Sequence, residues 1–159
     1  EQACIEFQEA YGLKIAILRP FNIYGPRQRC DQYGGVIARF IERLQGGKPP
    51  VIYGDGLQTR DFIYVQDAVS ALILALSRDG AIGRIFNVAT GVPTSVNQLA
   101  HLLMELFVIE GVKPQHRPSR LGDIRDSYAN IKEATLHLGF KPQFSLEEGL
   151  VALLQDMPS

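Results

Sequence analysis

The stretch KIAILRPFNIYGPRQ at residues 14–28 decides the fold. It begins with a short, nearly continuous apolar run, which is typical of a strand covered on both faces, as in a parallel sheet. The run ends at Pro20, and a polar loop that contains Gly and Pro follows from Asn22 to Gly35. Ligands of open α/β sheets bind beyond the carboxyl ends of the strands, so this stretch predicts a strand that leads into a binding loop. A plain turn is the alternative, because Asn, Gly and Pro also favour turns.

Short strands and helices alternate along the rest of the chain. Residues 1–11 carry apolar side chains at helical spacing, and Gly12 is a natural helix stop. Because this helix begins at the first residue without an N-cap, we expect the chain to be a piece of a longer one. Further strands are predicted at residues 51–53, 62–65 and 85–89, and further helices at residues 36–44, 65–76, 95–107, 130–138 and from residue 145.

Two of these helices carry start signals, and a third carries an apolar stripe. Ser95 with Gln98, and Ser145 with Glu148, have the spacing of capping boxes. The helix at 65–76 has apolar residues at helical spacing: Val65, Val69, Leu72, Ile73 and Leu76.

Composition and charge narrow the class of protein. The 159 residues suffice for one domain with a hydrophobic core. Sixteen basic against seventeen acidic residues give a formal net charge of −1, whereas a general nucleic-acid-binding protein carries a basic excess. The longest apolar stretch is too short to span a membrane. Cys4 and Cys30 suit neither a metal site nor a disulfide framework, and the three histidines share no ligand spacing, so we expect no metal and a reduced, cytoplasmic setting.

A second motif, VIYGDGLQTRDF at residues 51–62, places an aromatic residue before a glycine-rich turn and an arginine after it. The planar ring of Tyr53 can flank a nucleobase, and the guanidinium of Arg60 can clamp phosphate oxygens. The alternative is a hairpin-like turn with a weak surface pair between Arg60 and Asp61.

A third motif, RPSRLGDIRD at residues 117–126, sets arginines beside a Gly-Asp pair. Such arginines can hold a diphosphate, and the carboxylate can accept hydrogen bonds from ribose hydroxyls. A solvated, charged loop is the alternative.

The three motifs, in this order and at these separations, resemble the C-terminal half of the extended short-chain dehydrogenase/reductases that act on nucleotide sugars, the UDP-glucose 4-epimerase-like epimerases and dehydratases. The resemblance covers residues 1 to about 153. It implies an α/β fold that comprises the last part of a Rossmann-type parallel sheet, at residues 1–30, and a small C-terminal α/β domain that binds the nucleotide sugar, at residues 31–159. It also implies NAD as the cofactor of full-length members and a UDP- or dTDP-sugar as the ligand.

The same resemblance implies roles for particular residues. Pro20 matches the position whose backbone meets the nicotinamide carboxamide. Asn22, Arg60 and Arg120 match residues that bind the substrate diphosphate, and Asp123 matches a carboxylate on the ribose. The nucleotide is implied to lie against Gly35, Val36, Val51 and Tyr53, with Tyr53 as the stacking residue.

The resemblance places the catalytic residues outside these 159 residues. Family members use a Tyr as general base with a Lys four residues later, just before a pair like Glu1-Gln2, and a glycine-rich NAD loop further upstream. We therefore expect this chain to be inactive and to bind no NAD by itself. Tyr128 and Lys132 have the same spacing, but family members have an ordinary surface helix there.

Two other functions are open from the sequence. The chain could be a non-catalytic nucleotide-sugar-binding module, or the product of a truncated gene that covers its exposed sheet edge by self-association. The resemblance implies a homo-oligomer, because helices matching residues 1–11 commonly form the dimer interface. Among the reactions of the family, the epimerase-like one is favoured over dehydration or decarboxylation.

Overall fold

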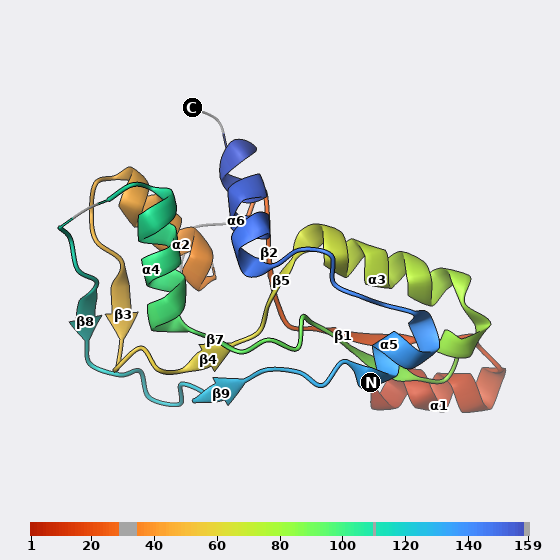
Figure 1. The fold of residues 1–159 in the computed structure, drawn as a ribbon. Coiled ribbons are helices and arrows are strands. Elements are labelled where there is room, and N and C mark those ends of the chain that lie inside the picture. The colour runs from red at the N-terminus through yellow and green to blue at the C-terminus, as the bar shows by residue number, and fades with distance from the viewer. Residues whose placement is uncertain (29–34, 110, 158–159) are drawn as a thin grey trace.

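The computed structural model describes residues 1–28, 35–109 and 111–157, which form two lobes joined by strands near the middle (Figure 1). The helices are α1 (Gln2–Tyr11), α2 (Val36–Gln45), α3 (Val65–Ser77), the short 3₁₀ helix η1 (Asp79–Ala81), α4 (Val96–Leu106), α5 (Lys132–Leu138) and α6 (Leu146–Gln155). The strands are β1 (Ile17–Pro20), β2 (Asn22–Tyr24), β3 (Val51–Tyr53), β4 (Thr59–Arg60), β5 (Phe62–Tyr64), β6 (Ile85–Val88), β7 (Thr94–Ser95), β8 (Gln115–Arg117) and β9 (Asp126–Ser127). Within these residues, no helix combines the length and apolar character that a membrane crossing requires.

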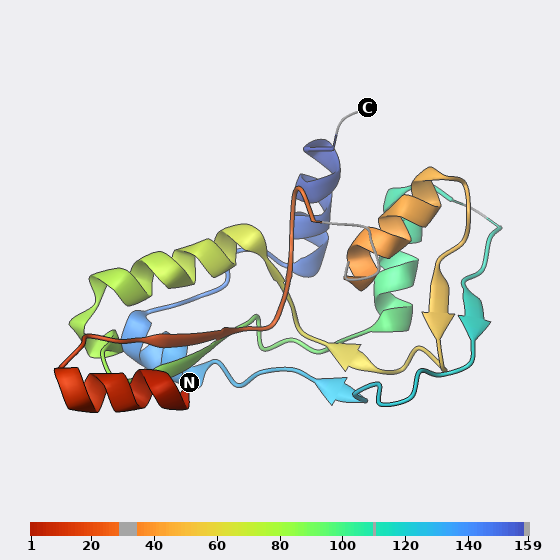
Figure 2. The same ribbon diagram turned by 180° about the vertical axis from the view of Figure 1, so that it is seen from behind.

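The first lobe is built on a parallel strand pair. β1 pairs with β6 in register from Ile17 opposite Ile85 to Pro20 opposite Val88. In both views α3 and α1 lie on opposite sides of this pair, and α5 lies close to β6 (Figures 1 and 2). Phe86, Val88, Leu138 and Phe140 are fully buried between these elements. The predicted α/β class with a parallel first strand is confirmed.

Strand β1 is less covered than its apolar sequence predicts. Ile17 and Leu18 are half-buried, Arg19 and Pro20 are exposed, and α1 has no buried residue. Within the described parts of the chain β1 pairs with β6 alone, so its second edge carries no partner strand. The prediction of a strand covered on both faces is therefore only partly met in these 159 residues.

The second lobe packs helices α2, α4 and α6 around the larger core. Its interior includes Phe40, Ile52, Leu99, Leu103 and Leu150, all at most 2% exposed. β3 pairs in parallel with β8, and β4 lies between antiparallel β7 and parallel β9. Both predicted capping boxes are present, at the start of α4 and of α6.

Strand β5 separates the two cores. It pairs in parallel with β2, and its successive side chains point to opposite faces, as in any strand. Phe62 and Tyr64 enter the larger core, whereas Ile63 enters the smaller one. The predicted boundary between residues 30 and 31 falls outside the described residues, so the assignment of the two parts to cofactor and ligand stays a prediction.

Helix α3 turns its large apolar residues outward. Val69, Leu72, Ile73 and Leu76 are 46–89% exposed. The buried face consists of Asp67, Ala68 and Ala71 instead. Because the two alanines are small, the helix approaches β5 and β2 closely, and the apolar stripe seen in the sequence is not the core face.

The buried carboxylate of Asp61 ties three segments together. Its Oδ1 accepts hydrogen bonds from the backbone N–H and the hydroxyl of Thr90, at 2.8 and 2.6 Å. Its Oδ2 accepts from the N–H groups of Gly91 and Ala129, at 2.9 and 3.2 Å. The side chain is 0% exposed, so the predicted alternative of an Arg60–Asp61 surface pair is wrong. A carboxylate with four donors can remain buried because its lone pairs are satisfied.

Replacing Asp61 by Asn should destabilise the fold. The amide would turn an NH₂ group toward backbone N–H donors, which leaves buried donors unpaired. We expect a loss of about 1–3 kcal/mol in the free energy of unfolding, measured by urea denaturation. The matched control is Glu105→Gln, the same isosteric change on the exposed face of α4, which should stay within about 0.5 kcal/mol. Equal stability of the two variants would contradict this role for Asp61.

Candidate functional site

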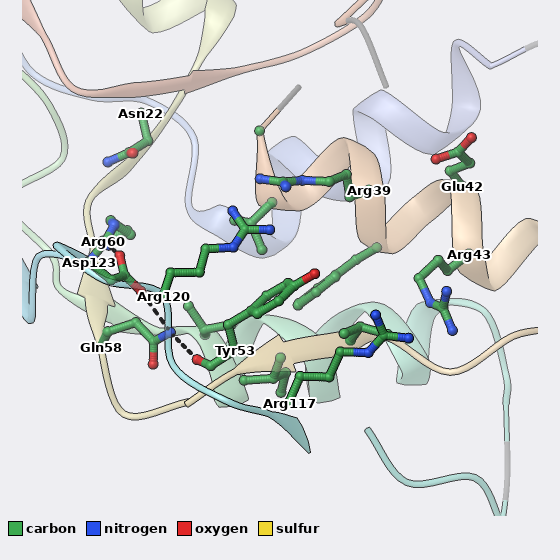
Figure 3. Close-up of a pocket in the computed structure, with 16 residues that line it drawn as sticks. Asn22, Arg39, Glu42, Arg43, Tyr53, Gln58, Arg60, Arg117, Arg120 and Asp123 are labelled. Atoms are coloured by element: carbon green, nitrogen blue, oxygen red, sulfur yellow. Dashed lines mark hydrogen bonds and ion pairs between the residues drawn. The ribbon is translucent and has the colours of Figure 1, made fainter. Parts of the chain in front are cut away.

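A cavity of about 480 Å³ opens in the second lobe between α2, β3, β8 and the loop before β9 (Figure 3). All the residues that the sequence assigned to the ligand line this cavity: Asn22, Gly35, Val36, Val51, Tyr53, Arg60, Arg120 and Asp123. Pro20 is not among the lining residues and lies exposed at the end of β1. Segments more than 100 residues apart in the sequence, from Asn22 to Asp123, therefore meet at one site.

Asn22, the first residue of β2, is held in place by hydrogen bonds to the backbone of Asp61. Its Nδ2 donates to the backbone oxygen of Asp61 at 2.9 Å, and its own N–H donates to the same oxygen at 3.2 Å. This orients the amide and leaves it a second N–H proton for a ligand.

Arg60 is held by the loop opposite it. One terminal nitrogen donates to the backbone oxygens of Thr59 and Ile124, each at 2.7 Å, and the other donates to Oδ1 of Asp123 at 2.6 Å. These bonds use three of the five guanidinium N–H protons. The remaining two, on Nε and on the second terminal nitrogen, are the ones that can meet a phosphate.

Gln58 is a site residue that the sequence analysis missed. It is 7% exposed, and its Nε2 donates to the backbone oxygen of Tyr53 at 2.8 Å and to Oδ2 of Asp123 at 3.4 Å (Figure 3). It thus links the strand that carries the aromatic ring to the loop that carries the carboxylate. No motif signals this role, because the contact spans 65 positions of the chain.

The glycine-rich turn after β3 is fixed by a close approach and by an ion pair. Gly56 has φ +74°, and a Cβ atom on it would lie 2.0 Å from Oδ1 of Asn97, so only glycine fits. A guanidinium nitrogen of Arg125 donates to both carboxylate oxygens of Asp55, at 2.7 and 2.9 Å. The Asp55–Arg125 pair therefore joins the turn to the loop before β9 outside the cavity, and the Gln58–Asp123 hydrogen bond joins them at the cavity lining.

Tyr53 and Arg120 stack on one another inside the cavity. The guanidinium carbon of Arg120 lies 3.9 Å from the centroid of the Tyr53 ring, a cation–π contact. Arg117 stands beside them, because it is the register partner of Tyr53 in the β3–β8 pair. Hydrogen bonding and charge from Arg120, and to a smaller extent from Arg117, hold the pKa of the Tyr53 hydroxyl below its usual value.

The cavity carries more positive charge than the sequence motifs suggested. Five arginines line it against two carboxylates, those of Glu42 and Asp123. Arg39 and Arg43 lie outside the three motifs, whereas Arg117 belongs to the third motif without having been assigned a role of its own. Arg39 and Arg43 follow Val36 by three and seven positions, so helical spacing from a predicted site residue could have found them. An acceptor-rich or anionic ligand fits this lining.

The described residues offer little for a metal or for proton transfer. Within them, no three His, Cys, Asp or Glu side chains form a group that could hold a metal ion. Nδ1 of His101 and Nδ1 of His116 each lie 2.8 Å from a backbone oxygen. Tyr128 is 58% exposed, Lys132 begins α5, and neither lines the cavity.

The parallel strands, with helices on both sides and a ligand-sized cavity past their ends, define an α/β protein of the Rossmann type. The sequence profile of the NAD dependent epimerase/dehydratase family matches residues 1–89, and the chain belongs to this family.

Relatives with known names support this assignment. The chain is 39% identical over 144 residues to a protein named putative UDP-glucose 4-epimerase from Methanocaldococcus jannaschii, and 38% identical over 149 residues to the UDP-glucose 4-epimerase of Mycolicibacterium smegmatis. These alignments cover 91% and 94% of this chain but 46% and 47% of the relatives, so the chain spans about half of their length.

Solved structures show the same relation. The UDP-glucose 4-epimerase of Thermotoga maritima, determined with UDP-glucose, superposes with a TM-score of 0.92 at 40% identity. The match covers 97% of this chain and 49% of that one. The Thermus thermophilus UDP-glucose 4-epimerase, determined with NAD, superposes with a TM-score of 0.83 at 31% identity over 97% of this chain and 50% of its own.

The Tyr53 hydroxyl should lose its proton at a lower pH than an ordinary tyrosine, because its pKa is lowered. Because the neighbouring guanidinium stabilises the phenolate, Arg120→Ala should move its pKa upward, toward the usual value. The measurement is a tyrosinate ultraviolet titration, compared with Tyr53→Phe, in which the earliest transition should disappear. An unchanged titration curve in Arg120→Ala would show that this arginine does not act on the hydroxyl.

Proposed function

We propose that this chain is the nucleotide-sugar-binding portion of an NAD-dependent epimerase/dehydratase of the UDP-glucose 4-epimerase-like kind. The observation that carries the proposal is the convergence of Asn22, Arg60 and Arg120 on one cavity that also holds Tyr53 and Asp123. Amide and guanidinium donors suit a diphosphate, an aromatic ring suits a base, and a carboxylate suits ribose hydroxyls.

The ligand would lie along the cavity in a fixed direction. The base would stack on Tyr53, the last residue of β3. The ribose hydroxyls would donate to the carboxylate of Asp123, which Gln58 and Arg60 orient by donating to its Oδ2 and Oδ1. The diphosphate would then receive hydrogen bonds from Arg120, from the two remaining protons of Arg60 and from Asn22. The sugar group would extend from the cavity toward the end of β1, because ligands of parallel sheets bind beyond the carboxyl ends of the strands.

UDP-sugars are the ligand class that the comparisons favour. The relatives and structures that match this chain include proteins named for UDP-glucose, UDP-glucuronate and UDP-N-acetylglucosamine, and one named for dTDP-L-rhamnose. We therefore propose a UDP- or dTDP-sugar as the ligand and C4 epimerisation as the reaction of the full-length protein.

NAD would supply the hydride chemistry in that protein, but the described residues do not form an NAD site. Among them only Pro20, exposed at the end of β1, stands where the nicotinamide is proposed to lie. The 159-residue sequence has no glycine-rich strand–turn–helix to hold a dinucleotide pyrophosphate. We propose that this chain binds the nucleotide sugar without converting it.

The ligand contacts can be tested by calorimetric titration with UDP and UDP-glucose. Arg60→Ala and Arg120→Ala should each weaken binding by about 10- to 100-fold, because each removes a charge-assisted hydrogen bond to phosphate. Arg84→Ala is the matched control. It also removes one positive charge, but Arg84 is an exposed arginine near Glu133 and does not line the cavity. Equal effects of all three substitutions would mean that only net charge matters, and no binding by the unsubstituted chain would refute the proposed ligand class.

The absence of turnover is a separate prediction. Incubation of the chain with UDP-glucose and NAD should give no C4 epimer by nuclear magnetic resonance, because the described cavity lining contains no Tyr–Lys pair of the kind that the family uses. Appearance of the epimer at a rate that Tyr128→Phe abolishes would instead make Tyr128 and Lys132 catalytic.

A non-catalytic module that self-associates is the second candidate, and the exposure of α1 favours it. Phe7 and Tyr11 are 54% and 70% exposed, with their rings 5.3 Å apart, and no residue of α1 is buried. An exposed apolar patch of this kind marks an interaction surface. We expect a dimer or larger species by size-exclusion light scattering, and a monomer for Phe7→Glu. A monomer at every concentration of the unsubstituted chain would remove the proposed homo-oligomer.

A further inference from the structure

The ring proposed to stack on the base is already covered by a side chain. Arg120 has its guanidinium carbon 3.9 Å from the Tyr53 centroid, which is the separation that a stacked base would need. Figure 3 shows the guanidinium of Arg120 over this ring, within the cavity. A base and the guanidinium cannot occupy the same face of Tyr53 together.

The same arginine is also proposed to bind the diphosphate. These two roles of Arg120 compete, because a base that stacks on the face of Tyr53 covered by the guanidinium requires the guanidinium to leave the ring. Ligand binding must therefore move Arg120 off Tyr53. Arg60, by contrast, is held by three hydrogen bonds to the protein and stays in place.

We infer that Arg120 makes the site selective for nucleoside diphosphates over nucleosides, by covering Tyr53 until a phosphate group offers its guanidinium a new partner. This inference rests on the proposed function and adds a discrimination to it. A nucleoside diphosphate displaces the guanidinium from the ring and replaces the lost contact with charge-assisted hydrogen bonds, which are stronger. A nucleoside displaces it and offers nothing in return, so its affinity is reduced by the full value of the cation–π contact.

The surroundings of the ring support this exchange. Arg117 remains beside Tyr53 after Arg120 leaves, because the β3–β8 register fixes its backbone. Asp123, one of the two carboxylates of the cavity lining, is already paired with Arg60 at 2.6 Å and does not draw Arg120 away from the ring. Within the described parts of the chain, the guanidinium of Arg120 contacts the ring face of Tyr53 and interacts with its hydroxyl.

The test compares uridine and UDP on the unsubstituted chain and on Arg120→Ala. Uridine binding is followed by nuclear magnetic resonance titration of the H5 and H6 protons, and UDP binding by calorimetry. We expect opposite changes: uridine affinity should rise by roughly 2- to 30-fold, the value of a cation–π contact, whereas UDP affinity should fall by about 10- to 100-fold.

Two controls isolate the covering of the ring. Arg84→Ala removes an exposed arginine that does not line the cavity and should leave uridine affinity unchanged. In a Tyr53→Leu background, Arg120→Ala should no longer raise uridine affinity, because there is no ring to uncover. Circular dichroism of each variant establishes that it is folded.

The outcomes separate this inference from the proposed function. If the unsubstituted chain binds UDP but Arg120→Ala leaves uridine affinity unchanged or lower, the covering of Tyr53 by Arg120 has no part in selectivity and the inference is overturned while the nucleotide site stands. If the unsubstituted chain binds neither UDP nor UDP-glucose, the proposed function itself fails. A rise in uridine affinity of the same size in Arg84→Ala would attribute the effect to net charge and would also overturn the inference.

Discussion

The carboxylate of Asp61 is the contact on which the arrangement of the site depends. It lies between β4 and β5, where the two cores meet, and accepts hydrogen bonds from residues 90, 91 and 129. The backbone oxygen of Asp61 also accepts a hydrogen bond from the side-chain amide of Asn22. Arg60, the preceding residue, reaches Asp123 in the opposite direction. Asp61 thus fixes Asn22 and the segments at residues 90 and 129, and the adjacent Arg60 holds the loop that carries Asp123. The positions of ligand-binding side chains therefore depend on this structural residue.

Contacts within the protein offset part of the cavity's positive charge. Its arginines repel one another, and the chain reduces this cost by pairing Arg60 with Asp123 and by placing Arg120 on an aromatic face. Arg43 donates through Nε to the backbone oxygen of Pro49 at 2.6 Å. The hydrogen bonds of Arg60 and Arg43 orient these two donors for a ligand, which is the usual basis of preorganised recognition, whereas Arg120 has to leave the ring to bind phosphate.

Local sequence signals predicted more of this protein than long-range ones did. The parallel strand at β1, the two capping boxes and part of the cavity lining, including Asn22, Tyr53 and Arg60, could be found from motifs, because turns, caps and strand ends leave signatures within a few positions. The burial of Asp61 and the bridge made by Gln58 could not, because each is defined by partners up to 68 positions away. The stripe on α3 misleads for a related reason: periodicity shows that a helix has an apolar face, but not which element covers it.

The alternation of side chains along β5 has a consequence for how such a protein can be divided. The larger core draws on residues from Tyr24 to Met104 and again on Leu150 and Leu153, whereas the smaller one uses residues 63–88 and then 134–140. Any single break between residues 104 and 134 therefore removes part of both interiors. Two cores do not make two exchangeable modules here: recombination between relatives could replace one core without the other only by several crossovers, and the segment is inherited most easily as one block.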